Sequence, residues 1–113
     1  MIESIIINYL INQGVANGKV YAETPVDPPA EYVLVSRTRG NIYNRVRSYG
    51  IYTESRSRTS KETAATLHET VISAMDEIRD HTSLMRCELE TDYDAAMTSS
   101  KEYRYQALWG ITE

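Results

Sequence analysis

The chain has 113 residues and a formal net charge of −4, with one cysteine, no phenylalanine and nine tyrosines. Its length is that of one ordinary domain, so we expect a single domain spanning residues 1–113. One cysteine excludes an internal disulfide, and no apolar run approaches the length that spans a bilayer. The first residues lack a basic leader and a small-residue cleavage site, so we expect a soluble intracellular protein without a signal peptide.

The first third of the chain predicts a helix, a short strand and a loop. Apolar residues recur at helical spacing over residues 2–13, and Gly14 supplies a stop. The β-branched run Ile5–Ile7 leaves a strand as the competing interpretation, although the spacing favours a helix. Residues 19–23 are a candidate strand. The three prolines of residues 24–32 predict a loop, because proline lacks the donor that a strand ladder needs.

Two long extended stretches follow this loop. Residues 31–39 are rich in β-branched and aromatic side chains and predict a strand. Gly40–Asn41 is a candidate turn, and residues 41–58 predict a second extended stretch. Gly50 stands in the middle of that stretch, where we expect a bulge or a bend.

The clearest predicted element is a helix from Thr59 to about His81. Thr59 and Glu62 fit a capping box, in which Thr59 accepts from the Glu62 amide and Glu62 reaches back. A helix of about 20 residues is about 30 Å long, enough to cover one face of a sheet. Six apolar residues form one stripe along this helix: Ala64, Leu67, Val71, Ile72, Met75 and Ile78.

The last third of the chain predicts two strands joined by a polar loop. Residues 84–91 alternate between apolar and polar side chains, with Cys87 on the apolar side. Residues 92–101 are polar and predict the loop. Over residues 103–111 every second residue is apolar or aromatic, so we expect a strand held inside the sheet with one face on the core helix. The whole order of elements predicts an α+β domain: a mostly antiparallel sheet of four to five strands with two helices packed on one face.

Charge is unevenly distributed along the chain. The basic segment, Arg37–Arg58, contains six arginines and a single acid, Glu54, for a net charge of +5. Residues 1–36 carry −3 and residues 59–113 carry −6. Such segregation usually marks a surface that meets a partner of opposite charge, either nucleic acid or the acidic part of another copy.

The arginines of the basic segment interleave with tyrosines, and three interpretations follow. The composition suits phosphate contacts with base stacking, a solvated strand edge, or a protein interface. Tyrosine combines apolar area with a polar tip, which favours the interface. We therefore expect this segment to contact carboxylates of a neighbouring subunit in the acidic stretches 76–80 and 88–94. The candidate interface residues are Arg37, Arg39, Arg45, Arg47, Tyr49, Tyr52, Arg56, Arg58, Asp76, Glu77 and Asp80.

No catalytic arrangement emerges from the sequence. His68 and His81 are thirteen residues apart on one predicted helix and point about 140° apart, so they should not share a ligand. His81 is expected to cap the helix C-terminus, and Cys87 to be a buried structural thiol. Asp92 and Asp94 fall far short of a calcium loop. We expect a protein that is not an enzyme and that has no catalytic residues, no cofactor and no metal site.

Two motifs stand out in the overall layout. Pro-Pro-x-x-Tyr-Val at residues 28–33 leads into a strand, and Tyr-Arg-Tyr-Gln at residues 103–106 opens the closing strand. With these motifs, nearly the whole chain resembles the small tail-terminator, or tail-completion, proteins of long-tailed (siphovirus-type) bacteriophages. The resemblance implies a structural virion protein that forms a ring, commonly a hexamer, on the head-proximal end of the tail tube. Such a ring ends tube growth and joins the tail to the head connector.

The resemblance also implies the partners and the location of the protein. The partners are other copies of the chain in a ring, the tail tube protein, and a head-connector or neck protein. DNA would pass through the lumen without sequence-specific binding, and no membrane is involved. The location would be the head-proximal end of the virion tail, after assembly in the host cytoplasm. Two alternatives stay open: a head-completion or neck protein of the same particle, and a small nucleic-acid-binding protein that uses Arg37–Arg58.

Overall fold

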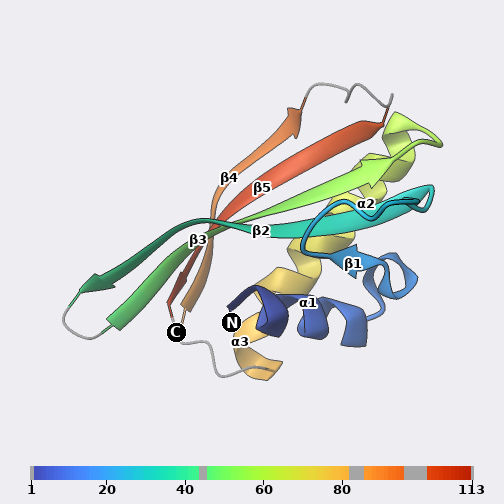
Figure 1. The fold of residues 1–113 in the computed structure, drawn as a ribbon. Coiled ribbons are helices and arrows are strands. Elements are labelled where there is room, and N and C mark those ends of the chain that lie inside the picture. The colour runs from blue at the N-terminus through green and yellow to red at the C-terminus, as the bar shows by residue number, and fades with distance from the viewer. Residues whose placement is uncertain (1, 44–45, 82–85, 96–101, 113) are drawn as a thin grey trace.

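A computed structural model describes residues 2–43, 46–81, 86–95 and 102–112. It confirms the predicted fold class: a five-stranded, mostly antiparallel sheet with helices on one face (Figure 1). In chain order the elements are α1 (Ile2–Asn12), the 3-10 helix η1 (Val15–Gly18), β1 (Val20–Tyr21), β2 (Glu31–Tyr43), β3 (Val46–Ser57), α2 (Lys61–Asp76), α3 (Ile78–His81), β4 (Arg86–Ala95) and β5 (Tyr103–Thr112).

The strand order in the sheet is β1-β2-β3-β5-β4. β1 pairs with β2 in parallel, and every other neighbouring pair is antiparallel. After β3 the chain crosses the sheet through α2 and α3, and β4 then forms the edge. β5 returns between β4 and β3, so the closing aromatic strand is an inner strand, as the alternation of residues 103–111 predicts.

The helices α1 and α2 cover one face of the sheet (Figure 1). Alternate residues of the inner strands point into this layer and are fully or almost fully buried, among them Ile51 of β3 and Trp109 of β5. The Trp109 indole donates to Thr53 Oγ1 at 3.0 Å, which satisfies both buried polar groups. The core therefore lies between the sheet and its helices, and we call this side of the sheet the helix face.

The N-terminal helix forms as its apolar spacing predicts. Ile6 and Leu10 are fully buried, and the helix ends before Gly14, which adopts a left-handed conformation with φ 77°. Tyr9 donates its hydroxyl to the backbone carbonyl of Ala74, which ties α1 to α2. Burial raises the pKa of Tyr9, and the nearby carboxylates of Glu77 and Asp80 raise it further.

The second helix corrects two details of the prediction. Its N-cap is Ser60, whose side chain accepts from the Thr63 amide at 3.0 Å; Thr59, the predicted cap, lies one residue outside. The helix also stops at Glu77, and a separate short helix, α3, follows it. The predicted apolar stripe is correct, since Ile72 packs against the core and the other five members are buried.

The β2–β3 hairpin is longer than the sequence indicates. Gly40–Asn41 is not a turn, because β2 continues through both residues to Tyr43. Gly50 lies inside β3 without ending it, and the expected irregularity falls on the opposite strand, where the register shifts between Arg37 and Arg39. The outer part of the hairpin extends beyond the helices (Figure 1). We call it the arm: residues 38–43 and 46–50.

The edge strand β4 contradicts the predicted loop at residues 92–101. The strand runs on to Ala95, so Asp92 and Asp94 are strand residues that pair with β5. A register shift between Leu89 and Thr91 marks a bulge at this edge. β4 tolerates these acidic residues because it lies at the edge of the sheet, where among the described residues it pairs only with β5.

Candidate interaction surfaces

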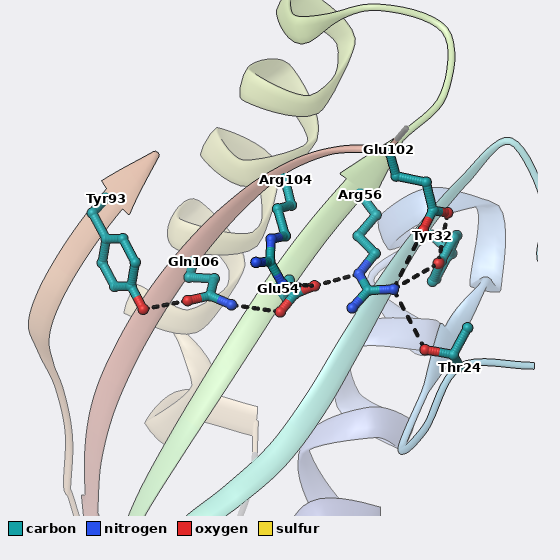
Figure 2. A network of polar contacts seen from close by, with 8 residues as sticks. All are labelled: Thr24, Tyr32, Glu54, Arg56, Tyr93, Glu102, Arg104 and Gln106. Carbon is teal, nitrogen blue, oxygen red and sulfur yellow. Dashed lines mark hydrogen bonds and ion pairs between the residues drawn. The ribbon is translucent and has the colours of Figure 1, made fainter. Parts of the chain in front are cut away.

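The face of the sheet opposite the helices carries a continuous network of polar side chains (Figure 2). On the inner strands these residues alternate with the core residues, because successive strand residues point to opposite faces. The network runs from β4 across β5, β3 and β2 to the loop that follows β1. Its members are Thr24, Tyr32, Glu54, Arg56, Tyr93, Glu102, Arg104 and Gln106.

Glu54 stands at the centre of this network and is only 2% exposed. Its carboxylate pairs with the Arg56 guanidinium and accepts from Gln106 Nε2 at 2.6 Å. Arg104 Nη1 lies 3.7 Å from the same carboxylate. A buried carboxylate needs such partners, because an unpaired charge at this depth is costly. The Tyr93 hydroxyl extends the network to β4 by donating to Gln106.

Arg56 connects the network to β2 and to the residue before β5. Its Nη1 donates to the Tyr32 hydroxyl at 3.1 Å and lies 3.4 Å from Glu102 Oε1. Tyr32 in turn donates to Glu102 Oε2 at 2.7 Å. Burial and then the hydrogen bond to Glu102 raise the Tyr32 pKa. A weaker contact of 3.5 Å joins Arg56 to Thr24 in the loop.

The network is electrically balanced. Two arginines, Arg56 and Arg104, face two carboxylates, Glu54 and Glu102, so its formal net charge is zero. Bidentate or networked pairs of this kind orient the strands that carry them. Part of the basic segment is therefore neutralised within the subunit, which the sequence prediction of an outward basic surface did not foresee.

The structure divides the predicted interface residues into separate groups. Arg56 belongs to the network, and Arg58 is exposed and donates to the Pro28 carbonyl at 3.0 Å. Tyr52 is half-buried on the face opposite the helices. At the base of the arm, Arg37 lies over the Tyr49 ring at 5.9 Å.

Two of the remaining arginines, Arg39 and Arg47, belong to the arm. Arg39 and Arg47 are strand residues of β2 and β3, and their side chains lie outside the description, as does the whole of Arg45. Arg37 has a side chain that is 52% exposed and that lies 3.8 Å from Glu3 of α1. The Glu3 side chain is 13% exposed, but a pair this long with a half-exposed arginine contributes little to stability.

The predicted acidic partners lie in two places. Asp76, Glu77 and Asp80 are exposed where α2 ends and α3 begins. Glu88 and Glu90 are exposed on β4, the edge strand. Both sets lie on the surface of the subunit.

One cluster around a buried histidine was missed by the sequence prediction. His68 of α2 is 3% exposed, bonds Asp92 of β4 through Nε2, and stacks on Tyr105 at 5.5 Å. Its Nδ1 is buried without a hydrogen-bond partner among the described residues. The burial of His68 could have been predicted from the sequence, because His68 follows Ala64 by four residues and so lies on the apolar stripe of the helix.

The other predicted chemistry concerns Cys87 and His81. Cys87 is partly buried against the core, and burial, followed by Asp76, raises its pKa to about 11, which makes it a poor nucleophile. His81 ends α3, but its side chain lies outside the description. Among the described residues no group of three or more His, Cys, Asp or Glu gathers to hold a metal ion. No helix in that part of the chain is long and apolar enough to cross a membrane.

Comparison with known proteins shows a similarity of fold to a solved structure and no match by sequence. No protein-family model matches the sequence, and no curated protein matches it. Among solved structures, a chain described as "Virion of native gene transfer agent (GTA) particle" matches with a TM-score of 0.59. The match covers 97% of this chain and 92% of that chain at 11% sequence identity. The two chains therefore share a fold over nearly their whole lengths.

Proposed function

We propose that this protein is a structural component of a phage-like virion and that six equivalent subunits form a ring that caps the head-proximal end of the tail tube. The ring ends growth of the tube and joins the tail to the head connector. In this role the protein needs no catalytic group, cofactor or metal. DNA passes through the ring without sequence-specific contacts.

The observation that carries the proposal is the fold shared with a chain of a gene transfer agent virion. The alignment spans almost all of both chains, so the likeness concerns the complete domain and not a common substructure. This agrees with the resemblance of the sequence to tail-terminator proteins, which rests on the motifs at residues 28–33 and 103–106. Fold alone does not fix function, so the position in the particle needs its own test.

The charge distribution supports assembly into a ring. In a ring each subunit uses one patch to contact a different patch on its neighbour. Here the arm carries arginines, whereas β4 and the end of α2 carry exposed carboxylates. Individual exposed ion pairs contribute about 0–1 kcal/mol, so several together would set orientation and register more than affinity.

Tail length and head attachment test the proposal. Particles made without this protein should have overlong tail tubes that are not joined to heads, as seen by electron microscopy. Adding the purified protein to tubes should place a ring at one end. Tubes of normal length without heads would instead favour the neck or head-completion alternative. Recovery of one enriched DNA sequence in a binding selection would favour the nucleic-acid-binding alternative, since specific binders prefer their sites by roughly 10³–10⁷.

The role of the arm in assembly has a matched test. Changing Arg45 and Arg47 together to Glu should leave the subunit folded but prevent ring formation on the tube. The control changes Lys19 and Arg79 together to Glu, which alters the net charge equally at exposed positions outside the basic segment. If both double variants assemble like the original protein, Arg45 and Arg47 do not contact the neighbouring subunit.

A further inference from the structure

Two strand edges in this fold lack a neighbouring strand. β4 is the last strand of the sheet and pairs only with β5 among the described residues. On the other side of the sheet, β1 pairs with β2 at Val33 and Leu34 alone. The outer edge of β2 from Val35 to Tyr43 therefore has no strand partner in the part of the chain that the structure describes. Each edge presents a row of backbone donors and acceptors.

The edge of β4 carries charged side chains and a bulge, which deter pairing with an identical edge, but it lacks other features that keep sheet edges apart. It is ten residues long and contains neither proline nor lysine. It also exposes two large apolar side chains, Leu89 at 42% and Tyr93 at 43%. A long edge of this kind is a template for pairing with another strand. Its bulge between Leu89 and Thr91 interrupts the ladder only locally.

The charges on the two edges decide which strand β4 accepts. β4 carries four carboxylates and one arginine, whereas β2 from Val35 to Tyr43 carries two arginines and no acid. Pairing of β4 with a second β4 would place carboxylates beside carboxylates, which destabilises a sheet. Pairing of β4 with the outer part of β2 places carboxylates beside arginines. The unfavourable self-pairing disfavours a two-fold dimer through β4 and favours a head-to-tail contact.

The direction of the two strands and the positions of their charged residues along the sheet agree with a contact between β4 and β2 of the next copy. Three antiparallel steps separate β2 from β4, so the two strands of one copy run in opposite directions. A rotation that carries one copy onto the next about an axis along the strands preserves direction, so β4 meets the neighbouring β2 antiparallel. In the register, Arg39 stands opposite Gly50, Gly50 opposite Gly110, and Gly110 opposite Glu88. The same rotation brings Glu88 of one copy level with Arg39 of the next.

We infer that β4 of one copy pairs antiparallel with the outer part of β2 in the next copy, with Glu88 beside Arg39, so that the sheets of neighbouring subunits join. This inference deepens the proposed ring and rests on it for its biological meaning. The contact is heterologous, so each added copy leaves one β4 edge and one β2 edge available, and the series ends when the ring closes. Backbone hydrogen bonds supply the affinity, and the charges supply the direction.

Disulfide trapping between two single-cysteine chains tests the contact. In a Cys87→Ser background, one chain carries Arg39→Cys and a second chain, of different length through a tag, carries Glu88→Cys. The chains are mixed at high concentration and oxidised, and covalent dimers are measured on a non-reducing gel. We expect the mixed dimer to form at least about tenfold faster than either homodimer, because bridging requires Cα atoms within about 7 Å.

A shift of register provides the matched control. Asn41→Cys stands two residues from Arg39 with no register shift between them, which moves the thiol by about 6.7 Å along the strand. Mixed with the Glu88→Cys chain, it should form the dimer more slowly by a similar factor. Equal rates at both positions, or homodimers of the Glu88→Cys chain in excess of the mixed dimer, overturn the inference. Circular dichroism of each variant confirms that the chain is folded before oxidation. The test needs no tail tube, so its failure is distinct from a failure of the proposed location in the virion.

Discussion

The two ends of the basic segment lie in different environments, although both are rich in arginine. At the inner end, Arg56 has a side chain that is 15% exposed and that bonds Glu54 and Tyr32. At the outer end, Arg37 has a side chain that is 52% exposed and lies 3.8 Å from Glu3. The inner end of β3 lies between β2 and β5, whereas the arm extends beyond the helices. Arginine on a sheet face is therefore structural at one end and available to a partner at the other.

The largest loss of stability is expected in the core, on the helix face of the inner strands. Trp109 is 1% exposed and bonds Thr53, so Trp109→Ala should lower the free energy of unfolding by about 3–5 kcal/mol. Leu89 stands opposite Trp109 in the β4–β5 register but is 42% exposed. Leu89→Ala should cost less than about 1 kcal/mol. Urea denaturation measures both variants, and similar losses would show that the edge strand is as well packed as the core.

The second prediction concerns the network at the inner end. Glu54→Gln keeps the shape of the side chain but removes the charge that faces Arg56 and Arg104. Removing one partner of a buried ion pair costs about 3–5 kcal/mol, and the retained bond to Gln106 should reduce the loss to about 2–3 kcal/mol.

A matched carboxylate serves as the control for Glu54. Glu69 lies on the exposed side of α2, and Glu69→Gln should change the free energy of unfolding by no more than about 0.5 kcal/mol. If Glu54→Gln is equally neutral, the network does not hold the inner end together, and Arg56 is as available to a partner as Arg37.

A smaller effect is expected where the inner end passes into α2. Ser60→Ala removes the cap on the Thr63 amide and should cost about 1 kcal/mol, whereas Thr59→Ala should cost less than about 0.5 kcal/mol. Thermal unfolding of the two variants gives the order. The reverse order would restore Thr59 as the cap and place the start of the helix one residue earlier than the structure does.

The sequence predicted the elements that depend on local periodicity. The stripe from Ala64 to Ile78 and the alternation over residues 103–111 both specify one buried face, and both are correct. Two adjacent candidates, Thr59 and Ser60, satisfy the rules for an N-cap, so spacing alone did not distinguish them. Gly40–Asn41 resembles a turn, but cross-strand pairing with Tyr49 and Ser48 keeps these residues in β2.

The polar network depends on contacts that are remote in sequence. Glu54 meets Gln106 across 52 residues, and Tyr32 meets Glu102 across 70, so no local pattern identifies either pair. Strand order decides both contacts, because β5 must first lie beside β3. Charge counting along the chain placed Arg56 with the other arginines of the basic segment, whereas the fold pairs it with the only acid in that segment.

The smallest expected effect is at the outer end of the comparison. Arg37→Gln should change the free energy of unfolding by less than about 0.5 kcal/mol, because its 3.8 Å contact with Glu3 is long and its 5.9 Å contact with the Tyr49 ring lies at the outer limit for a cation–π interaction. Arg56→Gln, the matched change at the inner end, should cost more, since it leaves Glu54 with fewer partners in a buried site. Urea denaturation at low and high salt separates the two, because salt screens the exposed pair and not the buried one. An equal loss of unfolding free energy for the two variants would mean that Arg37 fixes the arm to its own subunit. Arg37 would then not be available to the next copy.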